Sequence, residues 1–304
     1  MSGRHGLLVV DKPRGMTSHD VVAQARRLFH ERAVGHAGTL DPIATGVLVL
    51  LFGEACKLSG HLTAQQKVYR ASVRFGVGTD SLDADGNVLA RTELPASFPE
   101  VEALSAALRL EHERTEQVPP VVSAIHVEGE RAHLRARRGE TVELPPRPVQ
   151  VTRLELLSRQ EREIELELCV SKGYYVRALA RDLGAALGVP AHLSALRRSA
   201  SGPFTLADAV GWPAEEQSPL MSLADAAKRA LPVTVLDADA VTAARQGKRI
   251  SKEQAQSSAP EQVSAWLSPT GELIALGVSL PDGTHRVLRG IVPRENLLKA
   301  AFQS

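Results

Sequence analysis

Cysteine is scarce in this sequence of 304 residues, which contains only Cys56 and Cys169. Two cysteines cannot build a disulfide framework, so the composition excludes a small disulfide-stabilised secreted scaffold and suits a reducing compartment. Long apolar runs are also missing, because no stretch approaches the roughly 20 residues that cross a bilayer. The apolar run at residues 7–10 is too short for a signal peptide. We therefore expect a cytoplasmic protein with no membrane partner.

Neither sign of charge is in excess, since 36 Lys and Arg residues offset 35 Asp and Glu residues to give a net charge of +1. A nucleic-acid partner would therefore have to bind a local basic surface. Aromatic residues make up only 4% of the chain, and three of them are tyrosines. The length predicts about two domains.

The sequence does contain one stretch dense in turn-forming residues, G-H-A-G-T-L-D-P-I-A-T-G at positions 35–46. Glycine permits backbone conformations that other residues avoid, and Pro42 biases Asp41 toward an extended conformation. The apolar run Val47–Phe52 that follows predicts a buried central strand. The pattern predicts a carboxylate, Asp41, on a stiff loop beside a strand, although most segments of this composition are simply turns.

Two segments near this loop contain residues that a site could use. Residues 11–18, D-K-P-R-G-M-T-S, predict a loop that ends in a helix cap, with Lys12 as a phosphate contact or a structural contact. Residues 66–76 alternate in polarity as a strand does, with Tyr69 on the apolar face.

Two later segments are predicted to add to the same site. Residues 171–184 predict a strand end, a glycine turn and a helix, and they contain Tyr175 and Arg177. Residues 172–198, here named the basic segment, hold five basic residues and one acid. A solvated helix face would mix signs, so this excess predicts a phosphate-facing surface.

Local patterns predict four other features. Residues 153–171 alternate in polarity, which predicts one strand with a solvent-exposed face. The sequence S-F-P-E at 97–100 predicts a capping box. Residues 79–87 lack the ligand spacing of a calcium loop and predict a polar hairpin loop closing at Asp85-Gly86. Residues 199–231 have a weak pattern and are expected to be the linking region of the first domain.

Taken together, the motifs resemble the TruB family of tRNA pseudouridine-55 synthases. The central stretch is similar to the family signature G-H-x-G-x-L-D-P-x-A-x-G-x-L, and residues 7–210 match the family's K-P-x-G-x-T-S, K-x-Y-R, S-K-G-x-Y-x-R and L-R-R motifs in order. The resemblance implies an α+β pseudouridine synthase fold over residues 1–231, with a mixed, mainly antiparallel central sheet and flanking helices. Short strands expected over 232–304 predict a small β-barrel that resembles an RNA-binding PUA domain.

The resemblance also implies a reaction: a monomer flips uridine 55 out of the T-loop of tRNA and isomerises it to pseudouridine, with no cofactor and no metal. Asp41 would attack or assist at the ribose or uracil, and an ion pair with Arg177 would keep its carboxylate ionised. His36 either fills the space that the base vacates or bonds a loop carbonyl. The catalytic residues implied are Asp41, Tyr69 and Arg177, and the substrate-binding residues implied are His36, Tyr69, Tyr175, Leu196, Lys12 and Arg197.

Residues 118–149 resemble the family's thumb loop, which closes over the RNA. Two residues depart from the family pattern, because His126 stands where lysine is usual and His133 where tyrosine is usual. The family's contacts at these two positions are therefore not carried over.

Two other functions fit parts of the sequence. A non-catalytic tRNA chaperone would use the same RNA surface, but the ordered motifs around Asp41 argue against it. An Asp-dependent hydrolase would need a second carboxylate or metal ligands nearby, and the motifs place none. The sequence leaves open whether the isomerisation passes through a covalent ester or a glycal.

Overall fold

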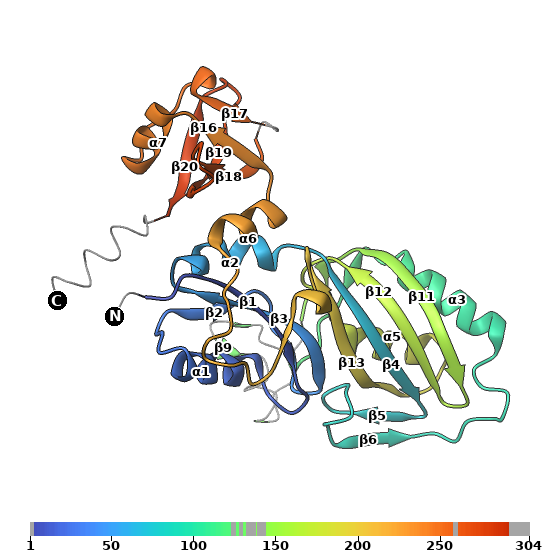
Figure 1. Ribbon diagram of the computed structural model, residues 1–304. Coiled ribbons are helices and arrows are strands. Elements are labelled where there is room, and N and C mark those ends of the chain that lie inside the picture. Colours follow the sequence, from blue (N-terminus) through green and yellow to red (C-terminus); the bar gives the residue numbers. More distant parts are fainter. Residues whose placement is uncertain are drawn as a thin grey trace.

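The computed structural model describes residues 3–122, 126–127, 130–131, 138, 144–257 and 261–291 (Figure 1). Its largest part is a nine-stranded sheet in which only two pairs of neighbours, β3 with β13 and β1 with β15, are parallel. This confirms the predicted mixed, mainly antiparallel sheet. Across the sheet lie β11 (Val151–Gln160), β12 (Glu163–Val170), β4 (Lys67–Phe75), β13 (Ala191–Ser201), β3 (Ala44–Phe52), β1 (Gly6–Lys12) and β15 (Val210–Gly211), with β14 (Phe204–Thr205) paired to β13 and β2 (Val34–His36) to β3.

Three helices cover one face of this sheet: α1 (Ser18–Leu28), α3 (Val101–His112) and α5 (Val176–Ala186) (Figure 1). The alternation of β4 explains the packing, because Tyr69, Ala71, Val73 and Phe75 point into the core beneath the helices. Helix α1 begins with a capping box between Thr17 and Asp20, which satisfies its first free amides.

The opposite face is covered only in part. Around β1 and β3 it packs against η1 (Gly53–Leu58), α2 (Ser59–Thr63) and α6 (Leu223–Ala230), so β3 is buried on both faces. This double burial accounts for its uninterrupted apolar sequence. Over β4 and β12 the same face carries charged residues such as Arg70 and Glu165.

The C-terminal part is a five-stranded mixed sheet in the order β17-β16-β18-β19-β20, with helix α7 beside it (Figure 1). A backbone bridge between Ile250 and His285 joins β20 to the segment that leads into β17, so the sheet curls. No helix in the described ranges is both long and apolar enough to cross a membrane. The elements are β16 (Val233–Leu236), α7 (Ala238–Arg245), η3 (Lys252–Gln254), β17 (Ala255–Ser257), β18 (Val263–Leu267), β19 (Leu273–Ser279) and β20 (His285–Gly290).

The structure corrects three of the local predictions. The single strand expected over 153–171 is the antiparallel pair β11–β12, because the chain turns at residues 161–162. The capping box at 97–100 is wrong, since α3 begins after Glu100 with no side-chain cap. The expected linker 199–231 contains β14, η2 (Leu206–Asp208), β15 and α6.

The remaining elements are short and lie at the edges. The predicted hairpin loop at 79–87 is confirmed, since it joins β5 (Val77–Thr79) to β6 (Val88–Arg91). Strand β7 (Glu116–Gln117) pairs with β10 (Arg147–Pro148), and β8 (His126–Val127) pairs with β9 (Glu130–Arg131). Most of the predicted thumb loop, including His133 and the side chain of His126, lies outside the described residues.

Candidate active site

The central feature of the site is an ion pair between residues 136 positions apart in the sequence. Asp41 comes from the loop before β3, and Arg177 comes from the first turn of α5. The Nε of Arg177 donates to Oδ2 of Asp41 at 2.9 Å, and its Nη2 donates to Oδ1 at 3.3 Å. The predicted pairing is confirmed, and its bidentate form fixes the plane of the carboxylate as well as its position.

Arg177 is itself held firmly. Its side chain is 6% exposed, and it also donates to the carbonyl oxygens of Ser81 and Val122, each at 2.9 Å. A second carboxylate, Asp83, lies 3.7 Å from its Nε and is 8% exposed. Asp41 is 36% exposed, so the pair presents one accessible carboxylate backed by a buried guanidinium.

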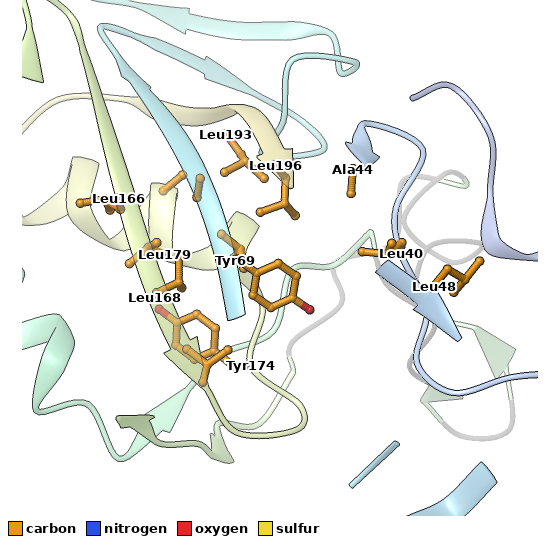
Figure 2. Close-up of a cluster of buried hydrophobic side chains, with 14 of the residues drawn as sticks. Leu40, Ala44, Leu48, Tyr69, Leu166, Leu168, Tyr174, Leu179, Leu193 and Leu196 are labelled. Carbon is orange, nitrogen blue, oxygen red and sulfur yellow. The ribbon is translucent and has the colours of Figure 1, made fainter. Parts of the chain in front are cut away.

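The accessible carboxylate lines a cavity of about 200 Å³. Figure 2 shows Tyr69, Leu196 and Leu40 around this region, with the Tyr69 ring projecting from β4 toward Leu40. Tyr69 and Leu196 are each 8% exposed. The structure therefore brings together the sequence-predicted residues Asp41, Tyr69, Tyr175, Arg177 and Leu196, and the other lining residues are Thr39, Leu40, Tyr174 and Val176.

The loop that carries Asp41 is tied to the start of α1. The buried Ser18 hydroxyl accepts from the Leu40 amide at 2.7 Å and donates to the Leu40 carbonyl at 3.1 Å. The Gly15 amide donates to the Pro42 carbonyl at 2.8 Å. Sequence reasoning placed Ser18 only as a possible cap, so its contact with the catalytic loop was missed.

Arg198 fixes the same loop from the sheet side. It is 1% exposed, and its guanidinium donates to the carbonyls of Gly38 (3.0 Å), Thr39 (3.2 Å) and Val47 (2.7 Å). Gly46 lets the backbone of Arg198 pair closely with β3, because a Cβ at position 46 would lie 2.2 Å from the carbonyl oxygen of Arg198, and the φ of Gly46 is +101°.

Lys12 lies beside this loop and is fully buried. Its Nζ donates to the carbonyls of Pro13 (2.9 Å) and Met16 (2.6 Å). Burial lowers the pKa of Lys12 to about 8, although the charge of Asp41 acts in the opposite direction. Of the two predicted roles, the structure supports the structural contact, because the ammonium bonds two backbone carbonyls; the phosphate contact stays a prediction.

His36 lies near the site but does not line the cavity. Its ring meets that of His19 edge-on, with the centroids 5.6 Å apart. Its Nδ1 is buried and has no hydrogen-bond partner among the described residues. Burial, followed by the nearby His19, lowers the pKa of His36 to about 4. This leaves the ring neutral at pH 7. The sequence analysis considered a hydrogen bond from His36 to a loop carbonyl, and Nδ1 does not form one with the described residues.

Only part of the basic segment faces outward as its composition predicted, since Lys172 is exposed and Arg181 is 33% exposed. Arg177 and Arg198 are buried, Arg197 pairs with Asp11 at 2.6 Å, and Arg181 pairs with the neighbouring carboxylate on α5. Four of the five basic residues, all except Lys172, bond carbonyls or carboxylates of the protein, because strand and helix direct their side chains toward these groups. Arg197, a predicted substrate contact, is 41% exposed despite its partner.

A buried network supports the tyrosine side of the cavity. The Tyr174 hydroxyl donates to Glu111 at 2.7 Å, and Arg114 donates to both oxygens of the same carboxylate. Burial raises the pKa of Glu111 and of Tyr174. Sequence reasoning missed Glu111 and also Asp83, which no local signal separates from Asp80 and Asp85 in the same hairpin loop.

Comparison with known proteins identifies the family of the chain. The family model described as TruB family pseudouridylate synthase, N-terminal domain, matches residues 26–176, and the model of the tRNA pseudouridylate synthase B C-terminal domain matches residues 177–240. A tRNA pseudouridine synthase B from Cutibacterium acnes is 46% identical over 279 residues, covering 89% of this chain and 92% of that protein. A tRNA pseudouridine synthase B from Mycobacterium tuberculosis is 48% identical over 222 residues, covering 72% and 74%.

Solved structures share the fold at lower identity. A chain in the crystal structure of a Cbf5–Nop10–Gar1 complex aligns with a TM-score of 0.73 and 24% identity, covering 96% of this chain and 87% of that chain. A chain of an H/ACA ribonucleoprotein bound to a substrate RNA containing 2′-deoxyuridine aligns with a TM-score of 0.71 and 23% identity, covering 96% and 86%.

The family matches define an enzyme of the pseudouridine synthase class, an isomerase. More particularly, the chain belongs to the TruB family of pseudouridylate synthases.

Proposed function

We propose that this enzyme isomerises the uridine at position 55, in the T-loop of tRNA, to pseudouridine. Isomerisation of tRNA uridine is the activity named for its relatives. The observation that carries the assignment to this site is the bidentate contact of Asp41 with the buried Arg177 at the wall of a cavity. A target base in a folded loop must leave its stack to enter such a cavity.

In this proposal Asp41 acts on the ribose or the uracil of the flipped nucleotide. The C1′–N1 bond breaks, the uracil turns, and a C1′–C5 bond forms, while the hydrogen on C5 leaves to solvent and N1 gains a proton. The atoms of the product are those of the substrate apart from this proton exchange. Arg177 donates to both carboxylate oxygens, so it fixes the orientation in which Asp41 meets the flipped nucleotide.

The cavity walls suit the base. Tyr69 presents its ring beside Leu196 (Figure 2), and an aromatic face with an apolar wall is how enzymes hold an extruded base. Tyr175, whose backbone is fixed to the Gln117 side chain by two hydrogen bonds, completes the wall. His36 and Arg197 are proposed to contact the RNA outside the cavity.

We also propose that residues 1–231 form the catalytic domain and residues 232–304 an RNA-binding PUA-like domain, in a monomer that acts in the cytoplasm. The curled five-stranded sheet of the C-terminal part supports the second assignment.

Tritium release from tRNA containing [5-³H]uridine tests the chemistry, and nucleoside mass spectrometry with carbodiimide labelling tests the position. The wild-type enzyme should release tritium and modify one T-loop uridine. Asp41→Asn should abolish turnover but keep tRNA affinity within roughly tenfold, because only a charge in the cavity is lost. Turnover at the wild-type rate in this variant would refute the role of Asp41. Release without a modified T-loop uridine would refute the position.

A further inference from the structure

A second cavity, of about 320 Å³, lies at the far end of β4 and has no part in the proposed chemistry. Its walls include Arg74, Arg91, Arg162 and His192, and we name it the arginine cavity. The three arginines come from different elements: the end of β4, the β6 strand of the hairpin, and the turn between β11 and β12. Arg74 follows Tyr69 by five residues along the strand, so their Cα atoms are about 17 Å apart.

Among the residues that the structure describes, these three arginines have no acidic partner. In the described ranges no carboxylate lies within 4.0 Å of any of their guanidinium groups. Glu163 faces Arg74 in the register of β12 and β4, yet the two do not form an ion pair. A neighbouring cavity of about 340 Å³ beside the Asp41 loop differs in this respect. Its arginines are each neutralised: Arg14 by Asp85, Arg70 by Glu165 and Arg197 by Asp11.

The three arginines are exposed and line one cavity. Like charges on one wall repel one another, and a bound anion relieves that repulsion. Their planar fork matches two oxygens of a phosphate at once. The wall between them is rigid, because His192 is 6% exposed and its Nδ1 is held 2.8 Å from the Val77 carbonyl. The volume is within the range of small-ligand sites.

We propose that the arginine cavity binds a phosphate group through Arg74, Arg91 and Arg162. The phosphate has two possible sources with the same chemistry: a phosphodiester of the RNA substrate, or a free nucleotide. The RNA source rests on the proposed function, whereas the free nucleotide does not.

The test uses the full chain with Arg91→Gln and Arg162→Gln combined, and Arg109→Gln as a matched control that removes one charge from the exposed face of α3. None of these residues belongs to the catalytic cavity. In the first arm, the Kd for unmodified tRNA is measured over a range of salt concentrations. If RNA supplies the phosphate, the double variant raises Kd roughly tenfold and reduces the slope of log Kd against log salt by about two, whereas the control changes neither.

In the second arm, adenosine 5′-monophosphate is titrated calorimetrically into the wild-type protein and the double variant, and Tm is recorded with and without it. If a free nucleotide is the ligand, the wild-type protein binds it and gains Tm, and the double variant does neither while its tRNA affinity stays at the wild-type level. Wild-type behaviour of the double variant in both arms would overturn the proposal. Both arms of this test measure binding, whereas the proposed isomerase activity is tested by tritium release. If the wild-type enzyme released no tritium, the proposed function would fail independently of these binding results.

Discussion

Replacing Arg177 by lysine keeps a positive charge beside Asp41 but removes the bidentate contact that orients its carboxylate. The variant therefore tests which of the two matters for the reaction. The arginine donates four side-chain hydrogen bonds, two to Asp41 and one each to the carbonyls of Ser81 and Val122. A lysine ammonium is a single point on a flexible stem and cannot make the bidentate contact. The variant therefore keeps the charge and loses at least one bond to the carboxylate and one to a carbonyl.

The magnitude follows from those losses. A hydrogen bond to a charged group contributes about 1.5–3 kcal/mol and one to a neutral group about 0.5–1.5 kcal/mol. We therefore expect the free energy of unfolding of Arg177→Lys to fall by about 2–4 kcal/mol. We expect the single-turnover rate of tritium release to fall by roughly 10² to 10³, the usual effect of misplacing a preorganised electrostatic group. The tRNA Kd should stay within roughly tenfold of the wild-type value.

The matched control is Arg181→Lys on the next turn of α5. Arg181 is 33% exposed and bonds Asp182 and the Val118 carbonyl, so its loss should cost about 1 kcal/mol or less and leave the rate within about twofold. Single-turnover rates at saturating enzyme and urea unfolding measure the two quantities. A wild-type rate for Arg177→Lys would show that charge alone suffices, and the reasoning from bidentate geometry would be wrong.

Three other outcomes are expected. Tyr69→Phe should slow the single-turnover step more than it weakens tRNA binding. An unchanged single-turnover rate would count against a role of the Tyr69 hydroxyl in the chemical step. The pKa of His36 is lowered from 6.5 to about 4, so the unfolded state binds more protons in that window and stability falls as pH drops through it. Between pH 7 and pH 5 the free energy of unfolding should fall by about 1 kcal/mol less in His36→Gln than in the wild-type protein, after allowance for partial exposure. Urea unfolding at both pH values measures this difference, and an identical fall in the two proteins would contradict the prediction. Gly46→Ala should cost about 3 kcal/mol or more because its Cβ meets Arg198, whereas Gly60→Ala, which meets nothing, should be close to neutral in Tm.

The loop that carries Asp41 could be predicted from sequence because the residues that form it are adjacent along the chain. Turn residues and the apolar run after them place Asp41 beside a buried strand, and Thr17 with Asp20 forms the cap expected before α1. The pairing of Asp41 with Arg177 came from resemblance to a family, since no local rule links residues so far apart.

What sequence could not predict depends on the direction of side chains. Strand β13 contains register shifts at 193–195 and 198–200, so simple alternation fails and Arg198 turns inward rather than toward RNA. Asp83 is buried next to Arg177, yet its neighbours in the same loop have identical chemistry and remain near the surface. Helix α7 was missed because it is only two turns long between strands.

The shared burial of β3 has a practical consequence for shortening the chain. Leu7, Val47 and Leu51 belong to one hydrophobic cluster with Leu267 and Leu276 of the C-terminal sheet. A deletion after residue 231 would open part of that cluster to water on the strand that follows Asp41. Any loss of activity in such a deletion would therefore include the effect of a weakened scaffold around Asp41. Point changes on the outer surface of the C-terminal sheet would test the proposed RNA binding without that effect.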